Sequence, residues 1–149
     1  MTPNKKRTIW LSILVLVAIS AAMGYYYYTK KPLNPENVSP DIQISSSELY
    51  QAFASDSVQA RKKFSRKNEV VEVSGIVTGV SINQDKQTVV LLQTHESGAS
   101  VNCTMEGDAK NAKLNDSIKL KGFSTGMGTG DADLGIMPDV YMIRCYLIK

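Results

Sequence analysis

The sequence predicts a mainly β protein, in which a five-stranded barrel follows a short helical pair and an N-terminal helix able to span a membrane. Three observations support this fold class. An apolar run lies near the N-terminus, two segments with helical spacing follow a proline-rich stretch, and five segments of alternating apolar residues complete the 149-residue chain. The part after the apolar run is long enough for one small domain.

Residues 8–28 form the predicted transmembrane anchor. They are apolar for most of their length and end in four tyrosines, and three basic residues precede them. A helix of about 20 residues rises ~30 Å, which matches the hydrocarbon core of a bilayer. Because basic residues stay on the cytoplasmic side, residues 1–7 are a cytoplasmic basic tail and the rest of a single-pass protein is extracytoplasmic.

A cleaved signal peptide is the alternative to a retained anchor. The small residues at 18–20 and at 22–24 fit a cleavage site. Either form exports the same domain. The tyrosine cluster followed by Lys30 and Lys31 favours a retained signal-anchor, because such residues hold a helix end at the membrane interface.

The charge of the chain is uneven. The three basic residues of the N-terminal tail account for the formal net charge of +3, so the remainder is formally neutral. A nucleic-acid binder needs a positive surface. One basic cluster remains, at residues 61–67, and it lies at a predicted helix end, where cations oppose the helix dipole. A phosphate-binding patch is the alternative interpretation of that cluster.

Residues 29–44 are rich in proline, asparagine and serine, which predicts a stiff polar tether to a domain at residues 45–149. Ser45 and Glu48 then form a capping-box pattern that starts a helix. Asp56 caps a second helix, and apolar residues recur four positions apart in both. The helical pattern ends at residues 65–68.

The first strand begins at Glu69, and its apolar residues change parity between Gly75 and Gly79, which predicts a bend. A polar turn follows. Further strands are predicted at 88–94, 99–105, 118–121 and 140–149. In the last of these, the predicted apolar face consists of Tyr141, Ile143, Cys145 and Leu147.

Two segments between the strands are irregular. Residues 106–116 are polar, and residues 125–138 form a glycine-rich loop. Five strands, with residues 106–116 as the insertion between the third and the fourth, fit the Greek-key barrel called the OB-fold.

Several segments carry a family resemblance: residues 48–53, 62–64, 71–77, 101–103, 118–122 and 139–145. In these segments the chain resembles the tRNA_anti-like OB-fold family of membrane-anchored bacterial extracytoplasmic proteins. The resemblance implies an OB barrel at the periplasmic or outer face of the bacterial cytoplasmic (inner) membrane. It names no ligand.

Cys103 and Cys145 are the candidates for a disulfide. Strand parity points both toward the core, and the third and fifth strands of an OB barrel are neighbours. An exported protein meets an oxidising compartment. The alternative is a pair of buried reduced thiols that behave as small apolar groups.

Two loops are the candidate ligand face, because they border the side on which OB barrels bind. The residues concerned are Asn83, Asp85, Met127, Asp131 and Asp133. The second loop also combines glycines with two acids, as calcium loops do. It lacks the spacing of an EF-hand, so an ordinary long loop is favoured and no metal is expected.

We expect no enzyme activity, no catalytic residue and no cofactor. His95 is the one histidine, in a predicted turn, and no nucleophile motif accompanies it. The predicted function is therefore a membrane-tethered module that binds a protein or small-molecule partner. The alternative is an OB domain for single-stranded nucleic acid or oligosaccharide. Nucleic acid is not the expected partner, because residues 88–105 contain no aromatic platform.

Overall fold

The computed structural model describes residues 3–29, 33–131 and 133–148, and the chain divides into two compact units, Met1–Leu33 and Asn34–Lys149. In the first unit, helix α1 spans Pro3–Thr29. Its segment Arg7–Thr29 is 23 residues long and apolar enough to cross a membrane, and it is not buried. Such a helix near the N-terminus could be a membrane anchor or a signal sequence.

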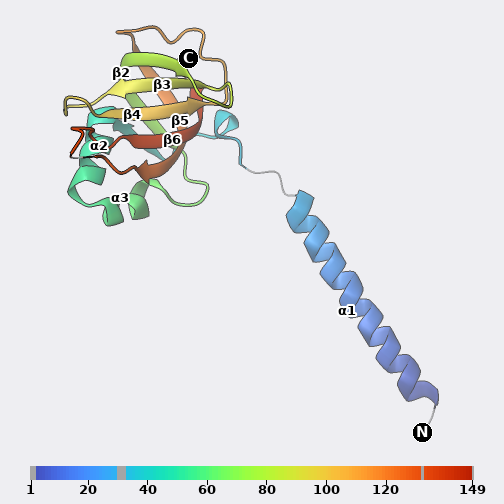
Figure 1. Cartoon of the computed structure of the whole chain (residues 1–149). Coiled ribbons are helices and arrows are strands. Elements are labelled where there is room, and N and C mark those ends of the chain that lie inside the picture. The colour runs from blue at the N-terminus through green and yellow to red at the C-terminus, as the bar shows by residue number, and fades with distance from the viewer. Residues whose placement is uncertain (1–2, 30–32, 132, 149) are drawn as a thin grey trace. The chain divides into compact units, whose positions relative to one another are not determined.

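The second unit is a closed barrel (Figure 1). Its elements are η1 (Pro35–Asn37), β1 (Ile42–Ser45), α2 (Ser46–Ser55), α3 (Ser57–Phe64), β2 (Val71–Ile82), β3 (Thr88–Gln93), β4 (Ser100–Met105), β5 (Ser117–Met127) and β6 (Val140–Leu147). The strands pair in the order β1-β2-β3-β4-β6-β5, and a β2–β5 pairing closes the barrel. The predicted mainly β fold, a five-stranded barrel preceded by helices, is confirmed.

Strand β2 is long enough to pair with two neighbours. Its first half, from Val71 to Ile76, pairs with β5, and its second half pairs with β3. The register shifts between Val77 and Gly79, inside the segment where the parity of the sequence predicts a bend. The bulge turns the strand around the corner of the barrel.

Both helices begin where the sequence predicts. Ser45 Oγ accepts a hydrogen bond from the Glu48 amide at 3.2 Å, and Glu48 Oε2 accepts one from the Ser45 amide at 3.1 Å. The hydrogen bonds from Ser45 lower the pKa of the Glu48 carboxyl. Asp56 Oδ1 accepts from the amides of Val58 and Gln59, which starts α3.

The helical pair closes one end of the barrel. Helix α2 contacts all six strands. Its Leu49 and Phe53 are buried in the core, and the Phe53 ring centroid lies 6.2 Å from that of Phe64 in α3. The helices are therefore part of the core that stabilises the barrel.

The structure differs from the predicted tether over residues 34–44. Element η1 contacts β5 and β6, because Lys121 Nζ donates to the carbonyl oxygens of Glu36 and Val38 at 2.7 and 3.1 Å. Strand β1 pairs in parallel with β2, and its isoleucines pack against the core. Proline and asparagine content concealed this strand, which is four residues long. Residues 30–32 of the predicted tether lie outside the described residues.

The buried face of strand β6 differs from the predicted apolar face. Val140, Met142 and Cys145 are fully buried, whereas Tyr141 and Ile143 are each 42% exposed. Arg144 has a φ of 54°, and the pairing with β5 shifts nearby. An extra residue at this bulge reverses the parity, so that Cys145 still faces the core.

Strand β5 is longer than predicted. It continues through Met127, so the following loop is shorter at its start than the glycine content of residues 125–138 suggests. Gly126 has a φ of 115°, a conformation that suits glycine, and the strand continues past it. Glycine here permits a bulge within a strand and does not end it.

Candidate functional site

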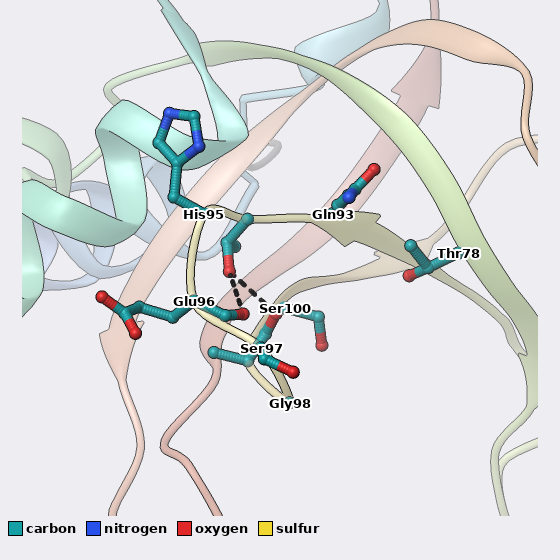
Figure 2. A pocket seen from close by; sticks show the side chains of 9 residues that line it. Thr78, Gln93, His95, Glu96, Ser97, Gly98 and Ser100 are labelled. Carbon is teal, nitrogen blue, oxygen red and sulfur yellow. Dashed lines mark hydrogen bonds between the residues drawn. The ribbon is translucent and has the colours of Figure 1, made fainter.

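The β3–β4 loop is held in shape by a buried threonine. Thr94 Oγ1 donates to the carbonyl oxygens of Glu96 at 3.1 Å and of Ala99 at 2.8 Å. Gly98 takes a φ of 84°, which closes the turn. With the backbone fixed, His95 and Glu96 are exposed, and their side chains leave the loop in different directions (Figure 2).

Three cavities adjoin one another around His95. Their volumes are about 520, 330 and 300 Å³, and His95 lines all three. The two cavities that meet β2 share a hydroxyl-rich lining, drawn from Ser45, Ser46, Ser47, Ser74, Thr78, Thr94, Ser97 and Ser100. Such a lining offers both donors and acceptors of hydrogen bonds.

Helix α2 supplies the second wall of this site. Ser46 Oγ donates to the carbonyl oxygen of Gln93 at 2.5 Å, which fixes the start of the helix on the end of β3. Gly75 allows this approach, because a Cβ there would lie 2.6 Å from Ser46 Oγ. As a result, Ser47 and Tyr50 line one cavity together with His95.

Tyr50 is an unusual group for a cavity wall because it is only 4% exposed. Burial raises the pKa of its phenol, and the negative charges of Glu96 and Asp139 raise it further. The hydroxyl therefore stays protonated at neutral pH and can donate a hydrogen bond.

The β5–β6 loop supplies the third wall. Asp139 Oδ1 accepts hydrogen bonds from the amide of Ser100 at 2.8 Å and from its hydroxyl at 3.0 Å. This contact fixes the end of the loop against the start of β4. Met137 lines the same cavity as Tyr50 and His95, and it is 39% exposed. It adds an apolar, adaptable contact to a polar site.

The surface defined by His95, Glu96, Tyr50, Met137 and Ser47 is called the His95 rim from here on. It combines an imidazole, a carboxylate, a buried phenol and a thioether from three segments far apart in the sequence. Among the described residues, no group of three or more His, Cys, Asp or Glu side chains could hold a metal ion. The rim can donate, accept and pack, which is the chemistry of binding.

The predicted ligand-face residues fall in two separate places. Asn83 and Asp85 belong to the β2–β3 hairpin, before the start of β3. There Asn83 Oδ1 accepts from the Gln87 amide at 2.9 Å, which closes the turn. The β5–β6 loop instead meets the β3–β4 loop, beyond the other end of β3. The structure does not bring the two predicted loops together.

The other three predicted residues lie at or near the β5–β6 loop. Met127 is the last residue of β5 and packs against the core. Asp131 Oδ1 accepts from the amides of Asp133 and Leu134 at 3.0 and 3.2 Å, so this carboxylate organises a turn. Asp133 is exposed. Among the described residues of this loop, Met137 lines the His95 rim, and sequence reasoning missed it.

Sequence reasoning also placed His95 in a turn and gave it no functional role. It is exposed, as expected for a turn, but its surroundings make it the shared wall of three cavities. No sequence signal marks this, because Tyr50 and Met137 have no regular spacing from His95. The lone histidine was the available clue.

Cys103 and Cys145 are both fully buried on neighbouring strands β4 and β6. A hydrogen bond with the Cys103 thiol, together with burial, raises the pKa of the Cys145 thiol well above its ordinary value. The register places Cys145 opposite Met105, two residues beyond Cys103. Both thiols are free in the structure, and the disulfide stays a prediction.

We expect both cysteines of the folded chain to resist alkylation, because neither is exposed, and the raised pKa of Cys145 also keeps its thiolate scarce. Mass spectrometry after iodoacetamide treatment measures this, with Ser81→Cys as an exposed control. Labelling as fast as at the control would contradict the burial. Repeating the reaction in denaturant without reductant then counts the thiols: two for a reduced pair, none for a disulfide.

A family model described as tRNA_anti-like matches residues 1–133 of the chain. The match includes α1, both short helices and strands β1 to β5. No curated protein matches the chain.

Proposed function

Because the chain belongs to the tRNA_anti-like family, we propose that its OB-type barrel is a non-enzymatic binding module, tethered at the outer face of a bacterial cytoplasmic membrane by α1. The family and the closed barrel support a binding role. The apolar length of α1, the basic tail before it and the tyrosines at its end support the tether and its orientation.

The His95 rim is the proposed binding surface. The observation that carries this proposal is the convergence of three cavities on one exposed imidazole, in a part of the barrel where α2 and two loops meet. Its groups suit a polar segment of a partner protein, or a small polar molecule, that also has an apolar part to contact Met137. The role proposed for this site is recognition, because its hydroxyls, carboxylate and imidazole can exchange hydrogen bonds with a partner.

A photo-crosslinking residue at position 95 is expected to capture the partner in intact cells, because His95 is exposed at the centre of the rim. The same residue at position 85, in the exposed hairpin turn, is the matched control. A product specific to position 95 supports the proposal. Equal products at both positions, or products at position 85 alone, would overturn it.

A second variant checks the chemistry of the rim. Replacing His95 and Glu96 with alanine is expected to reduce partner recovery on the order of tenfold or more, since lost hydrogen-bond partners at an interface cost about 1–3 kcal/mol. The pair Gln84→Ala and Asp85→Ala is the control. Unchanged recovery with the rim variant would place binding elsewhere.

A further inference from the structure

We propose that the exposed basic surface of α3 and the turn after it docks on anionic phospholipid headgroups. The basic surface consists of Arg61, Lys62, Lys63, Arg66 and Lys67, all of them exposed. The inference rests on the proposed tethering, and it adds a partner that the His95 rim does not address.

The helix dipole explains part of this cluster and not all of it. Arg61, Lys62 and Lys63 lie in the last turn of α3, where cations are stabilised. Arg66 and Lys67 lie beyond the helix end at Phe64. Interaction with the dipole of one short helix therefore does not account for all five positive charges within these seven residues.

The charges of the basic surface are not neutralised within the described part of the chain. The ion pairs found there involve Lys110, Lys119 and Arg144, and none involves the basic surface. Arg66 Nε donates to the carbonyl oxygen of Lys62 at 2.6 Å, and Lys63 Nζ lies 5.0 Å from the Phe64 ring centroid. Neither contact brings a carboxylate to one of these cations. The Glu69 carboxylate accepts a hydrogen bond from the Arg66 amide at 3.4 Å, and the five cations outnumber this acid.

The basic surface lies at the edge where the chain enters the barrel unit. The Asp41 amide donates to the Val70 carbonyl at 2.8 Å, and Asp41 Oδ2 accepts from the Val70 amide at 2.8 Å. Val70 follows Lys67 by three residues, so this contact joins the incoming chain to the end of the basic turn.

Element η1 is fixed to the same edge. Lys121, whose ammonium group donates to the carbonyls of Glu36 in η1 and of Val38 after it, pairs with Glu72 in the β5–β2 register. The incoming segment is therefore attached to the barrel from η1 onward, on the side where β2 begins.

The segment that joins α1 to the barrel unit is short. Helix α1 ends at Thr29 and the barrel unit begins at Asn34. The four intervening residues span about 14 Å at most when fully extended. Basic residues within about a Debye length of an anionic membrane are attracted to it, each shifting the docked fraction about fivefold.

The test uses the full chain in two kinds of vesicle, phosphatidylcholine alone and phosphatidylcholine with phosphatidylglycerol. Hydrogen–deuterium exchange of residues 61–68 is the measurement. We expect exchange at least fivefold slower with phosphatidylglycerol, and recovery of the faster rate in about 0.5 M salt, which screens the charges. Equal rates in both vesicles, or a difference that salt leaves intact, would overturn the proposal.

A charge variant tests which residues are responsible. Replacing Lys62, Lys63 and Arg66 with glutamine is expected to abolish the lipid dependence. The control replaces Lys86, Lys110 and Lys113, which are exposed on the hairpin and on the loop before β5, and should leave it unchanged. Loss of the dependence in the control alone would contradict the assignment, and the salt test on the natural chain stands even where the variant is unstable.

Flotation of the vesicles separates the two proposals. A chain that does not float with either vesicle contradicts the tether itself. A chain that floats with both, without a difference in exchange, leaves the tether intact and removes the lipid docking.

Discussion

Replacing Leu14 and Val17 with lysine is expected to remove the full-length chain from the membrane fraction. Both residues lie near the middle of α1 and are exposed in it. A lysine at the centre of a membrane-spanning helix costs about 2.5–3.5 kcal/mol, so two cost about 5–7 kcal/mol. Alkaline extraction of membranes followed by quantification of the pellet measures the effect.

The control for this experiment keeps the charge and changes its depth. Tyr28→Lys adds a lysine near the end of α1, where the long side chain can reach the headgroups. This variant should remain in the membrane pellet. Retention of the doubly substituted chain would show that α1 does not span the bilayer.

The mass of the mature chain distinguishes an anchor from a signal peptide. A retained anchor leaves residues 1–149 in one chain. Cleavage after residue 20 or residue 24 would release the barrel unit and would end the proposed tether, although export would stand.

Phe53→Ala is expected to lower the free energy of unfolding by about 3–5 kcal/mol. The Phe53 ring is 1% exposed and packs against Phe64, so its removal leaves a cavity between the helical pair and the barrel. For a domain of this size the loss is a large part of the total stability. Denaturant unfolding of the full chain in detergent, followed by circular dichroism, measures it.

Val58→Ala is the matched control, because Val58 lies in α3 and is 61% exposed. A change within about 0.5 kcal/mol is expected there. If Phe53→Ala were equally mild, the helices would be an appendage of the barrel and the His95 rim would lose the support that α2 gives it.

The sequence alone determined the elements that depend on neighbours within a few residues. The capping box at Ser45 and the cap at Asp56 predicted both helix starts, since a side chain satisfies amides two or three residues away. Alternation predicted the buried Val71, Val73 and Val77 of β2, and glycines marked its bend, whereas Val80 and Ile82 beyond the bend are exposed. The length of the apolar run predicted the membrane-spanning length of α1.

The tertiary structure alone decided three features. Arg144 takes a φ of 54°, and the bulge at this residue reverses the faces of β6, so Tyr141 and Ile143 are exposed where alternation predicts burial. Strand β1 forms because β2 offers it a free edge. The His95 rim exists because folding places α2, the β3–β4 loop and the β5–β6 loop together. Each depends on contacts between segments far apart in the chain. Local propensity does not predict such contacts, because it reflects only neighbouring residues.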